Sequence, residues 1–188
     1  MNKELIKRIL SSIVLIPLAL FFIIKGSILF VFFISICFLI IAYEWHTMSK
    51  KNYYYFHGLI FLICSFLTIY SLRIESTNYL ATLFVATVCV STDIGGYVFG
   101  KLFRGPKLTK FSPNKTYAGM LGGYFLSLIS VTIIPLFKFD VMQFNEFLFV
   151  IGISSVSQIG DITISYFKRL SKIKDTGKII PGHGGLLD

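Results

Sequence analysis

The sequence predicts an all-α, polytopic membrane protein with about six transmembrane helices. Of its 188 residues, 55% are hydrophobic and only 14% are charged, and the mean hydropathy is +0.76. Too little polar surface remains for a soluble domain of this size. Apolar runs close to the length that a spanning helix needs, about 20 residues, occur in six places: Ile9–Ile24, Ser27–Tyr43, Tyr53–Leu72, Tyr79–Gly100, Tyr117–Phe137 and Phe147–Phe167.

The first two runs are short and are separated only by Lys25 and Gly26, which predicts a tight helical hairpin. Basic residues precede the first run, as in a signal peptide, but no small-x-small cleavage site follows and the second run starts almost at once. We therefore expect the first run to be retained as a span. After the second run we expect a short loop, Glu44–Lys51, in which Glu44 and Trp45 lie at the membrane interface. No site is assigned to Glu44.

The basic residues predict the orientation of the spans. If the N-terminus is cytoplasmic, all but three of the 18 Lys and Arg residues fall in cytoplasmic segments, and the exceptions are Lys25, Arg73 and Lys138. Membrane proteins keep an excess of Lys and Arg on the cytoplasmic side. The net charge of +9 therefore belongs to a cytoplasmic membrane face, and no nucleic-acid partner is expected.

Two cytoplasmic segments, 100–115 and 168–188, each carry five cations among Gly, Pro, Ser, Thr or Asn residues. Such loops commonly just set topology and attract anionic lipid. The mixture of cations with flexible backbone N–H groups also suits the binding of phosphate groups. Both interpretations stay open on composition alone.

Two acids, Asp93 and Asp161, lie inside predicted spans, where a charged side chain costs about 2.5–3.5 kcal/mol or more. Asp93 stands seven residues before Gly100 and Asp161 seven before Lys168, so both lie roughly 10 Å below the cytoplasmic ends of their helices at 1.5 Å per residue. A shared depth predicts a shared site. Oxygen ligands near basic loops favour Mg²⁺ with phosphate, whereas a small ion- or proton-coupled transporter would use the same acids as a carrier site.

The faces that carry these acids differ in character. Along the sixth run, polar residues recur at steps of three and four and so share a face: Ser154, Ser157, Gln158, Asp161, Ser165 and Lys168. Plain interhelical hydrogen bonding would explain the Ser and Gln members. Along the fourth run the shared face consists of small residues around the acid, Ala86, Cys89, Asp93, Gly96 and Gly100. Small residues permit close approach of a helix or a ligand.

The motif SPNKT, from Ser112 to Thr116, comes directly before the fifth run. Ser and Thr are suited to cap the helix, and Lys115 would then project toward anions at the positive end of the helix dipole. Helix capping alone would also explain the pattern.

The last 24 residues resemble the phosphatidate cytidylyltransferase family, the CDP-diacylglycerol synthases. The family pattern runs S-x-x-K-R, four residues, K-D, then P-x-H-G-G and D-R-x-D. The matching residues are Ser165, Lys168, Arg169, Lys174, Asp175, Pro181, His183, Gly184, Gly185 and Asp188. The segment Asp93–Gly100, the SPNKT loop and Gln158–Asp161 are also similar, so the resemblance covers roughly residues 90–188. Because no repeat, linker or low-complexity segment divides the chain, we expect one membrane domain over 1–188, with N-terminal spans in 1–78 and a catalytic part in 79–188.

The resemblance implies transfer of the cytidylyl group of CTP to phosphatidic acid, with Mg²⁺ held by Asp161 and Asp188 and a second cation as a further expectation. It implies catalytic roles for Asp161, Asp188, Lys115 and Lys168. The substrate-binding residues implied are Ser112, Thr116, Ser165, Arg169, Lys174, His183, Gly184, Gly185 and Asp93. A homodimer in a bacterial inner membrane, in contact with membrane lipids, is also implied.

One departure concerns the end of the motif. The Arg-x-Asp that follows the last acid in the family, and the final span after it, are not in the sequence beyond Asp188. We therefore expect a final helix to be missing from this chain. The main alternative function is the transporter. A CDP-alcohol phosphotransferase is less consistent, because the acidic motif of that family is missing.

Overall fold

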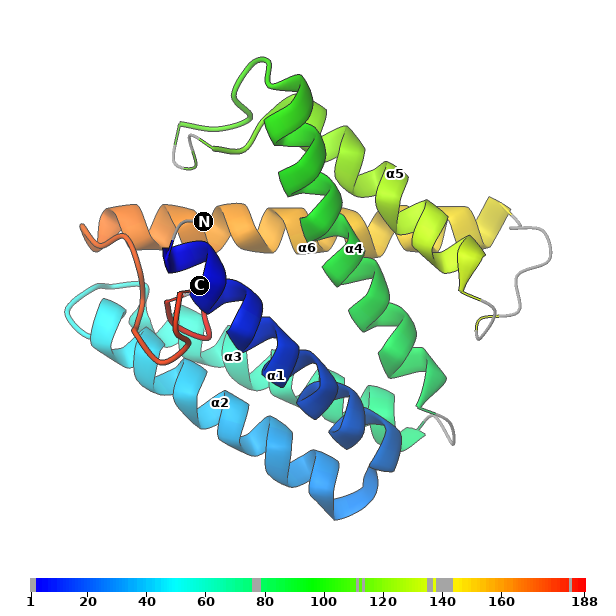
Figure 1. The fold of residues 1–188 in the computed structure, drawn as a ribbon. Helices are drawn as coiled ribbons and strands as arrows, with labels where there is room; N and C mark the ends of the chain where they lie inside the picture. The colour runs from blue at the N-terminus through cyan, green and yellow to red at the C-terminus, as the bar shows by residue number, and fades with distance from the viewer. Residues whose placement is uncertain are drawn as a thin grey trace. The chain divides into compact units, whose positions relative to one another are not determined.

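The computed structural model describes residues 3–75, 79–110, 112, 114–134, 137, 144–182 and 184–188. In this part of the chain lie six helices (Figure 1): α1 (Lys3–Lys25), α2 (Ser27–Ser49), α3 (Tyr55–Glu75), α4 (Leu80–Phe103), α5 (Tyr117–Ile133) and α6 (Phe144–Leu170). β-pairing among the described residues is confined to two isolated bridges, Lys107 with Thr116 and Ile180 with Gly184. The all-α prediction is confirmed.

Helix length and composition agree with a polytopic membrane protein. Over the described residues, four helical segments are long and apolar enough to cross a membrane: Ser27–Ser49, Tyr55–Ile74, Leu80–Phe103 and Phe144–Leu170. The apolar helical segments Leu10–Lys25 and Tyr117–Ile133 are shorter. Large apolar side chains such as Phe32, Leu39 and Phe61 are exposed, which in a bilayer places them against lipid.

The chain divides into two compact units, Met1–Thr82 with Lys168–Asp188, and Leu83–Phe167. The first unit contains α1, α2, α3 and the C-terminal segment. The second contains most of α4, all of α5 and most of α6. The predicted division near residue 78 into N-terminal spans and a catalytic part is not tested by this arrangement.

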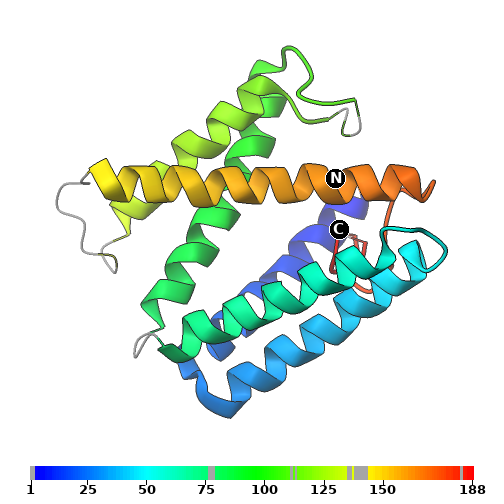
Figure 2. The same cartoon turned by 180° about the vertical axis from the view of Figure 1, so that it is seen from behind.

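In the first unit, α1 and α2 form the predicted hairpin, and α2 and α3 run side by side (Figure 2). Gly26 turns the chain with φ +62°. Arg73, in the last turn of α3, donates from Nε to the carbonyl oxygen of Ile23 at 3.0 Å and from Nη2 to that of Ile24 at 3.5 Å. These carbonyls at the end of α1 lack partners within the helix. Arg73 therefore caps α1, and a Cβ at position 26 would collide with its guanidinium group.

Helix α2 is longer than predicted, because it continues to Ser49 through most of the expected loop Glu44–Lys51. The expectation that Glu44 and Trp45 are solvated at the membrane interface is wrong, since both side chains are only 2% exposed. Trp45 packs against Gly58 and donates from Nε1 to the carbonyl oxygen of Tyr55 at 3.0 Å. Burial of these two side chains inside the first unit explains why the helix extends past the apolar run.

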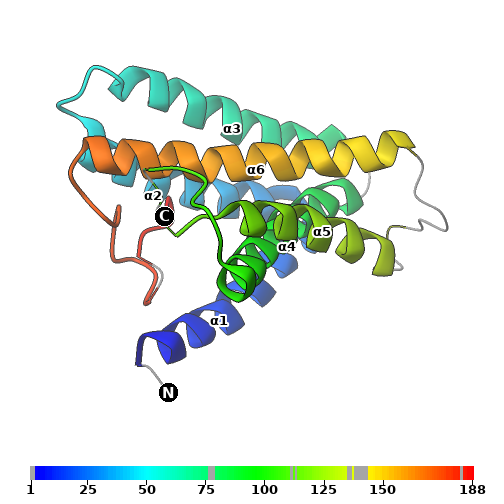
Figure 3. The same ribbon diagram turned by 90° about the horizontal axis from the view of Figure 1, so that it is seen from above.

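In the second unit, α4 and α5 lie side by side (Figure 3) and approach each other through glycines. A Cβ on Gly95 would fall on the carbonyl group of Gly122. A Cβ on Gly96 would lie 3.7 Å from the carbonyl oxygen of Gly119, and one on Gly100 3.2 Å from Oγ1 of Thr116. The prediction that small residues on this face of the fourth run permit close approach is confirmed.

Hydrogen bonds between side chains join α6 to its neighbours in the second unit. The Thr92 hydroxyl of α4 donates to Ser154 Oγ of α6 at 2.8 Å. The hydroxyls of Tyr124 on α5 and Ser155 on α6 are 2.9 Å apart. Ser154 on the polar face of α6 therefore forms an interhelical hydrogen bond, which is the structural role suggested for the Ser and Gln residues of this face.

Candidate active site

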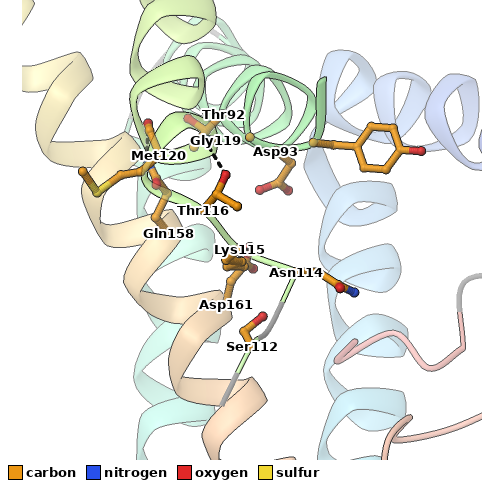
Figure 4. A pocket seen from close by; sticks show the side chains of 12 residues that line it. Thr92, Asp93, Ser112, Asn114, Lys115, Thr116, Gly119, Met120, Gln158 and Asp161 are labelled. Atoms are coloured by element: carbon orange, nitrogen blue, oxygen red, sulfur yellow. Dashed lines mark hydrogen bonds and ion pairs between the residues drawn. The ribbon is translucent and has the colours of Figure 1, made fainter. Parts of the chain in front are cut away.

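A pocket of about 270 Å³ lies within the second unit, between α4, the loop before α5, α5 and α6 (Figure 4). Its walls include both intramembrane acids, Asp93 and Asp161, together with Lys115 and Gln158. The prediction that the two acids share one site is therefore confirmed at the level of geometry. A polar pocket with two carboxylates and a cation is unusual within membrane helices, where ionisable groups are costly.

The loop that carries Lys115 is held by backbone hydrogen bonds at both ends. The N–H of Leu108 donates to the carbonyl oxygen of Lys115 at 2.8 Å, and the N–H of Tyr117 donates to that of Pro106 at 3.2 Å. Closer to the tip, the N–H of Lys115 donates to the carbonyl oxygen of Ser112 at 3.0 Å. These bonds fix the backbone from which the ammonium group reaches into the pocket.

Lys115 forms an ion pair with Asp161, with Nζ 2.7 Å from Oδ2. The two side chains are 29% and 46% exposed, respectively. The pair is therefore accessible to a ligand, and one oxygen of Asp161 is not used in this contact. A cation beside a carboxylate can bind a phosphate oxygen on one side and support a metal ion on the other.

Thr116 is the N-cap of α5, as the SPNKT motif predicts. Its extended backbone lies just before the helix, and its Oγ1 accepts a hydrogen bond from the N–H of Gly119 at 3.1 Å. Thr116 also lines the pocket, so the same residue caps α5 and contributes to the site.

We expect Thr116→Ala to lower the free energy of unfolding by about 1 kcal/mol, the usual cost of losing an N-cap. Thr116→Ser keeps the oxygen acceptor and should retain most of the stability. Thermal unfolding of both variants in the same detergent measures the difference. Equal stability of the Ala and Ser variants would show that the cap contributes nothing.

In the first unit, the Asp188 carboxylate accepts several hydrogen bonds from residues of the C-terminal segment. Lys168 Nζ lies 2.9 Å from Oδ1, the N–H of Thr176 donates to both oxygens at 3.0 and 2.9 Å, and the N–H of Gly185 donates to Oδ2 at 2.7 Å. Only 8% of the Asp188 side chain is exposed. Burial raises its pKa, but the hydrogen bonds from Gly185, Lys168 and Thr176 outweigh burial, and the pKa is lower than the ordinary value.

The C-terminal segment should therefore loosen in acid. A lowered pKa means that the Asp188 contacts stabilise the fold above the ordinary carboxyl pKa of about 3.9 and are lost as pH falls through the folded value. Pepsin cleavage of the segment in detergent, normalised to an unstructured peptide, should accelerate as the pH falls below the ordinary carboxyl pKa of about 3.9. Asp188→Asn lacks this side-chain carboxyl, so its normalised cleavage should accelerate less over the same pH interval than that of the wild type. A wild-type rate that stays constant would contradict the prediction.

A pocket of about 360 Å³ adjoins this segment within the first unit. Leu15 and Ile16 of α1 form an apolar wall, and Leu186 and Asp188 line the cavity from the C-terminal segment. Asp188 is therefore next to apolar surface as well as to Lys168.

Glu44 of α2 is a second buried carboxylate in the first unit, with a role that was not predicted from the sequence. Its oxygens accept hydrogen bonds from Thr176 Oγ1 at 2.9 Å, from the N–H of Leu186 at 2.9 Å and from the N–H of Leu187 at 2.8 Å. The available signal was an acid directly after an apolar run, whereas Asp93 and Asp161 were singled out because they lie inside their runs. Its proximity to Trp45 favoured an interfacial interpretation instead.

The other predicted site residues are distributed between the two units. Ser112 lines the pocket with Thr116, whereas Ser165 lies half-buried on α6 and is not among the residues that line it. Arg169 is exposed, and its Nη1 is 3.4 Å from the carbonyl oxygen of Ile173. Lys174 is exposed.

The glycine-rich turn of the C-terminal segment is built around two of the predicted residues. Gly184 has φ +107° and exchanges backbone hydrogen bonds with Ile180. The N–H of Gly185 donates a hydrogen bond to Oδ2 of Asp188. The prediction for His183 falls outside the described residues.

The donors in the pocket suit a hard cation. Asp93 and Asp161 offer carboxylate oxygens, and Ser112 and Thr116 offer hydroxyl oxygens. In the part of the chain that the structure describes, no three His, Cys, Asp or Glu side chains gather as a metal site. Mg²⁺ commonly takes one or two carboxylates and completes its shell with water and phosphate oxygens. The donor set fits that ion.

Comparison with known proteins agrees with this chemistry. The profile described as "Cytidylyltransferase family" matches residues 6–79 and 72–188. A phosphatidate cytidylyltransferase of Rickettsia conorii is 35% identical over 190 residues, which cover 96% of this chain and 83% of that protein. One of Staphylococcus saprophyticus is 36% identical over 164 residues, covering 82% of this chain and 61% of that protein. No solved structure matches. The chain belongs to the cytidylyltransferase family.

Proposed function

We propose that this protein transfers the cytidylyl group of CTP to phosphatidic acid, giving CDP-diacylglycerol and pyrophosphate. Its family and the names of its relatives support this proposal. The observation that carries it is the pocket in which Lys115 and Asp161 pair beside Asp93. Carboxylates and a cation in one polar pocket are the groups that bind a triphosphate together with its metal ion. The family match gives no support to the transporter hypothesis.

In the proposed reaction, an oxygen of the lipid phosphate attacks the α-phosphorus of CTP, and the bond from that phosphorus to the pyrophosphate oxygen breaks. Lys115 binds a phosphate oxygen of the nucleotide and stabilises the charge that develops there. Ser112 and Thr116 bind the nucleotide from the same pocket wall. Residues of the C-terminal segment contact phosphate groups: Lys168, Arg169, Lys174, His183, Gly184 and Gly185. Ser165 of α6 does the same from the second unit.

We assign Mg²⁺ to two carboxylates, that of Asp161 in the second unit and that of Asp188 in the first unit. The contacts of each carboxylate are considered separately. The half-exposed Asp161 carboxylate has an oxygen that its contact with Lys115 does not use. Asp188 lies beside Lys168 and the apolar wall of α1, which suits a charged headgroup attached to a lipid. When bound, Mg²⁺ neutralises charge on the triphosphate. A second cation is part of the same proposal.

We further propose a bacterial inner-membrane location, a cytoplasmic N-terminus, and a homodimer in contact with membrane lipids. The distribution of Lys and Arg supports the orientation, because it leaves only Lys25, Arg73 and Lys138 outside. CTP would then reach the site from the cytoplasm, and phosphatidic acid would reach it from the bilayer.

The purified protein in detergent–lipid micelles tests the proposal. We expect pyrophosphate release and CDP-diacylglycerol formation that require CTP, phosphatidic acid and Mg²⁺ together. Diacylglycerol, which lacks the attacking phosphate, is the matched control and should give no product. Absence of pyrophosphate with all three components would overturn the proposed function.

A further inference from the structure

We propose that Glu44 of α2 is a positioning residue that holds the C-terminal segment and, through Thr176, the Asp188 carboxylate. The inference deepens the proposed function, on which it rests, because it assigns part of the site to the N-terminal helices. Every contact that it uses lies within the first unit.

Glu44 is buried and fully engaged with the C-terminal segment. Its side chain is 2% exposed, and its two oxygens accept from the backbone N–H groups of Leu186 and Leu187 and from the hydroxyl of Thr176. These partners are 132 to 143 residues away in sequence. A buried carboxylate without partners would be costly, so the segment and Glu44 stabilise each other's placement.

Thr176 connects Glu44, which anchors the C-terminal segment to α2, with Asp188, the proposed metal ligand. Its hydroxyl donates to Glu44 while its backbone N–H donates to both oxygens of Asp188. Leu186 and Leu187, the other partners of Glu44, immediately precede Asp188. Asp188 is therefore fixed from both sides by residues that Glu44 binds.

The space around Glu44 is shaped for this contact by two glycines. A Cβ on Gly177 would lie 2.7 Å from Oε1 of Glu44, and a Cβ on Gly185 would fall against Oε2. A side chain at either position would force the Glu44 carboxylate or the segment to shift. Glycine at 185 therefore serves the approach to Glu44 as well as the hydrogen bond to Asp188.

Both side-chain oxygens of Glu44 must be hydrogen-bond acceptors for these contacts to form. A carboxylate can accept from Leu186, Leu187 and Thr176 at once. In Glu44→Gln one of these oxygens becomes an NH₂ group, which would face a donor N–H group or the Thr176 hydroxyl. Groups that orient a metal ligand typically change metal affinity or activity by about 10- to 100-fold when removed.

Four variants of the full chain test the proposal. Glu44→Gln disrupts the anchor, and Thr176→Val removes only the hydroxyl while it keeps the N–H that binds Asp188. Thr176→Ser restores the hydroxyl. Ser49→Ala is the matched control, because Ser49 is also buried on α2 and its hydroxyl donates to the carbonyl oxygen of Trp45 in its own helix.

Two measurements are made on each variant. The first is hydrogen–deuterium exchange of peptides that cover 171–188, which reports the hold on the segment without any substrate. The second is cytidylyl transfer as a function of Mg²⁺ concentration. For Glu44→Gln and Thr176→Val we expect at least about tenfold faster exchange and an about 10- to 100-fold loss of activity or rise in the half-saturating Mg²⁺ concentration. Thr176→Ser and Ser49→Ala should resemble the wild type.

The outcomes separate the two proposals. Unchanged exchange in Glu44→Gln and Thr176→Val overturns the anchor. Faster exchange with wild-type activity and Mg²⁺ dependence overturns the positioning role. If the wild-type protein performs no cytidylyl transfer, the proposed function fails and the positioning role fails with it, while the exchange data still decide whether Glu44 holds the segment.

Discussion

Asp161→Asn should abolish most of the Mg²⁺-dependent cytidylyl transfer, with a loss of at least about 100-fold, since residues that only orient a metal ligand already cost about 10- to 100-fold. The substitution keeps the shape of the side chain and removes its charge. It takes away the proposed metal ligand and leaves Lys115, 2.7 Å away, without its counter-ion. Pyrophosphate release at saturating CTP and phosphatidic acid measures the loss.

A purely structural role for the ion pair makes a different prediction, which the double variant Lys115→Gln/Asp161→Asn tests. If the pair only stabilises the fold, removal of both charges should restore much of what the single change costs. We expect stability to recover and activity to stay low. Thr163→Val, a neighbour on α6 whose hydroxyl bonds within the helix, is the control for expression and folding. Near-wild-type transfer by Asp161→Asn would show that the metal assignment is wrong.

Gly95→Ala should destabilise the second unit strongly, by about 1–3 kcal/mol, the usual cost of overpacking. The added methyl group would fall on the backbone of Gly122 and lie 2.9 Å from Cβ of Leu126. Backbone atoms cannot rotate away, so α4 and α5 must separate. Thermal unfolding in detergent measures the effect.

Gly152→Ala is the matched control for this prediction, because nothing lies within 4 Å of the position that its Cβ would take on α6. Alanine is the better helix former by about 1 kcal/mol, so this variant should be as stable as the wild type or more stable. Because Gly95 does not line the pocket, the Gly95→Ala protein should lose activity only as it unfolds. Equal unfolding temperatures for the two variants would contradict the packing described for α4 and α5.

The parts of the fold set by local pattern could be predicted from the sequence. Apolar runs gave six helices in their correct places, and the spacing of Asp93 and Asp161 from their helix ends placed both acids at one pocket. The SPNKT motif gave the cap at Thr116, because capping involves residues only three positions apart. These features depend on periodicity and short-range hydrogen bonds, which a single sequence displays.

The features that were missed depend on distant contacts. Glu44 and Trp45 follow an apolar run and look interfacial by position, yet tertiary packing buries both. No local pattern indicates that Glu44 meets Leu187. The ion pair between Lys168 and Asp188, which are 20 residues apart, was likewise not predicted. Hydropathy indicates which segments enter the membrane, but it does not indicate which polar side chains contact one another in the folded protein.

The contact between Glu44 and residues 176–187 also sets an order of events during biosynthesis. At about 5–20 residues per second, the ribosome adds Leu187 roughly 7–30 s after Glu44, since 143 residues separate them. Until Leu187 is made, α2 carries a carboxylate whose set of partners is incomplete. The first unit begins first and is completed last, after the chain of the second unit has been made. Maturation of the N-terminal helices therefore waits for the end of translation of this segment.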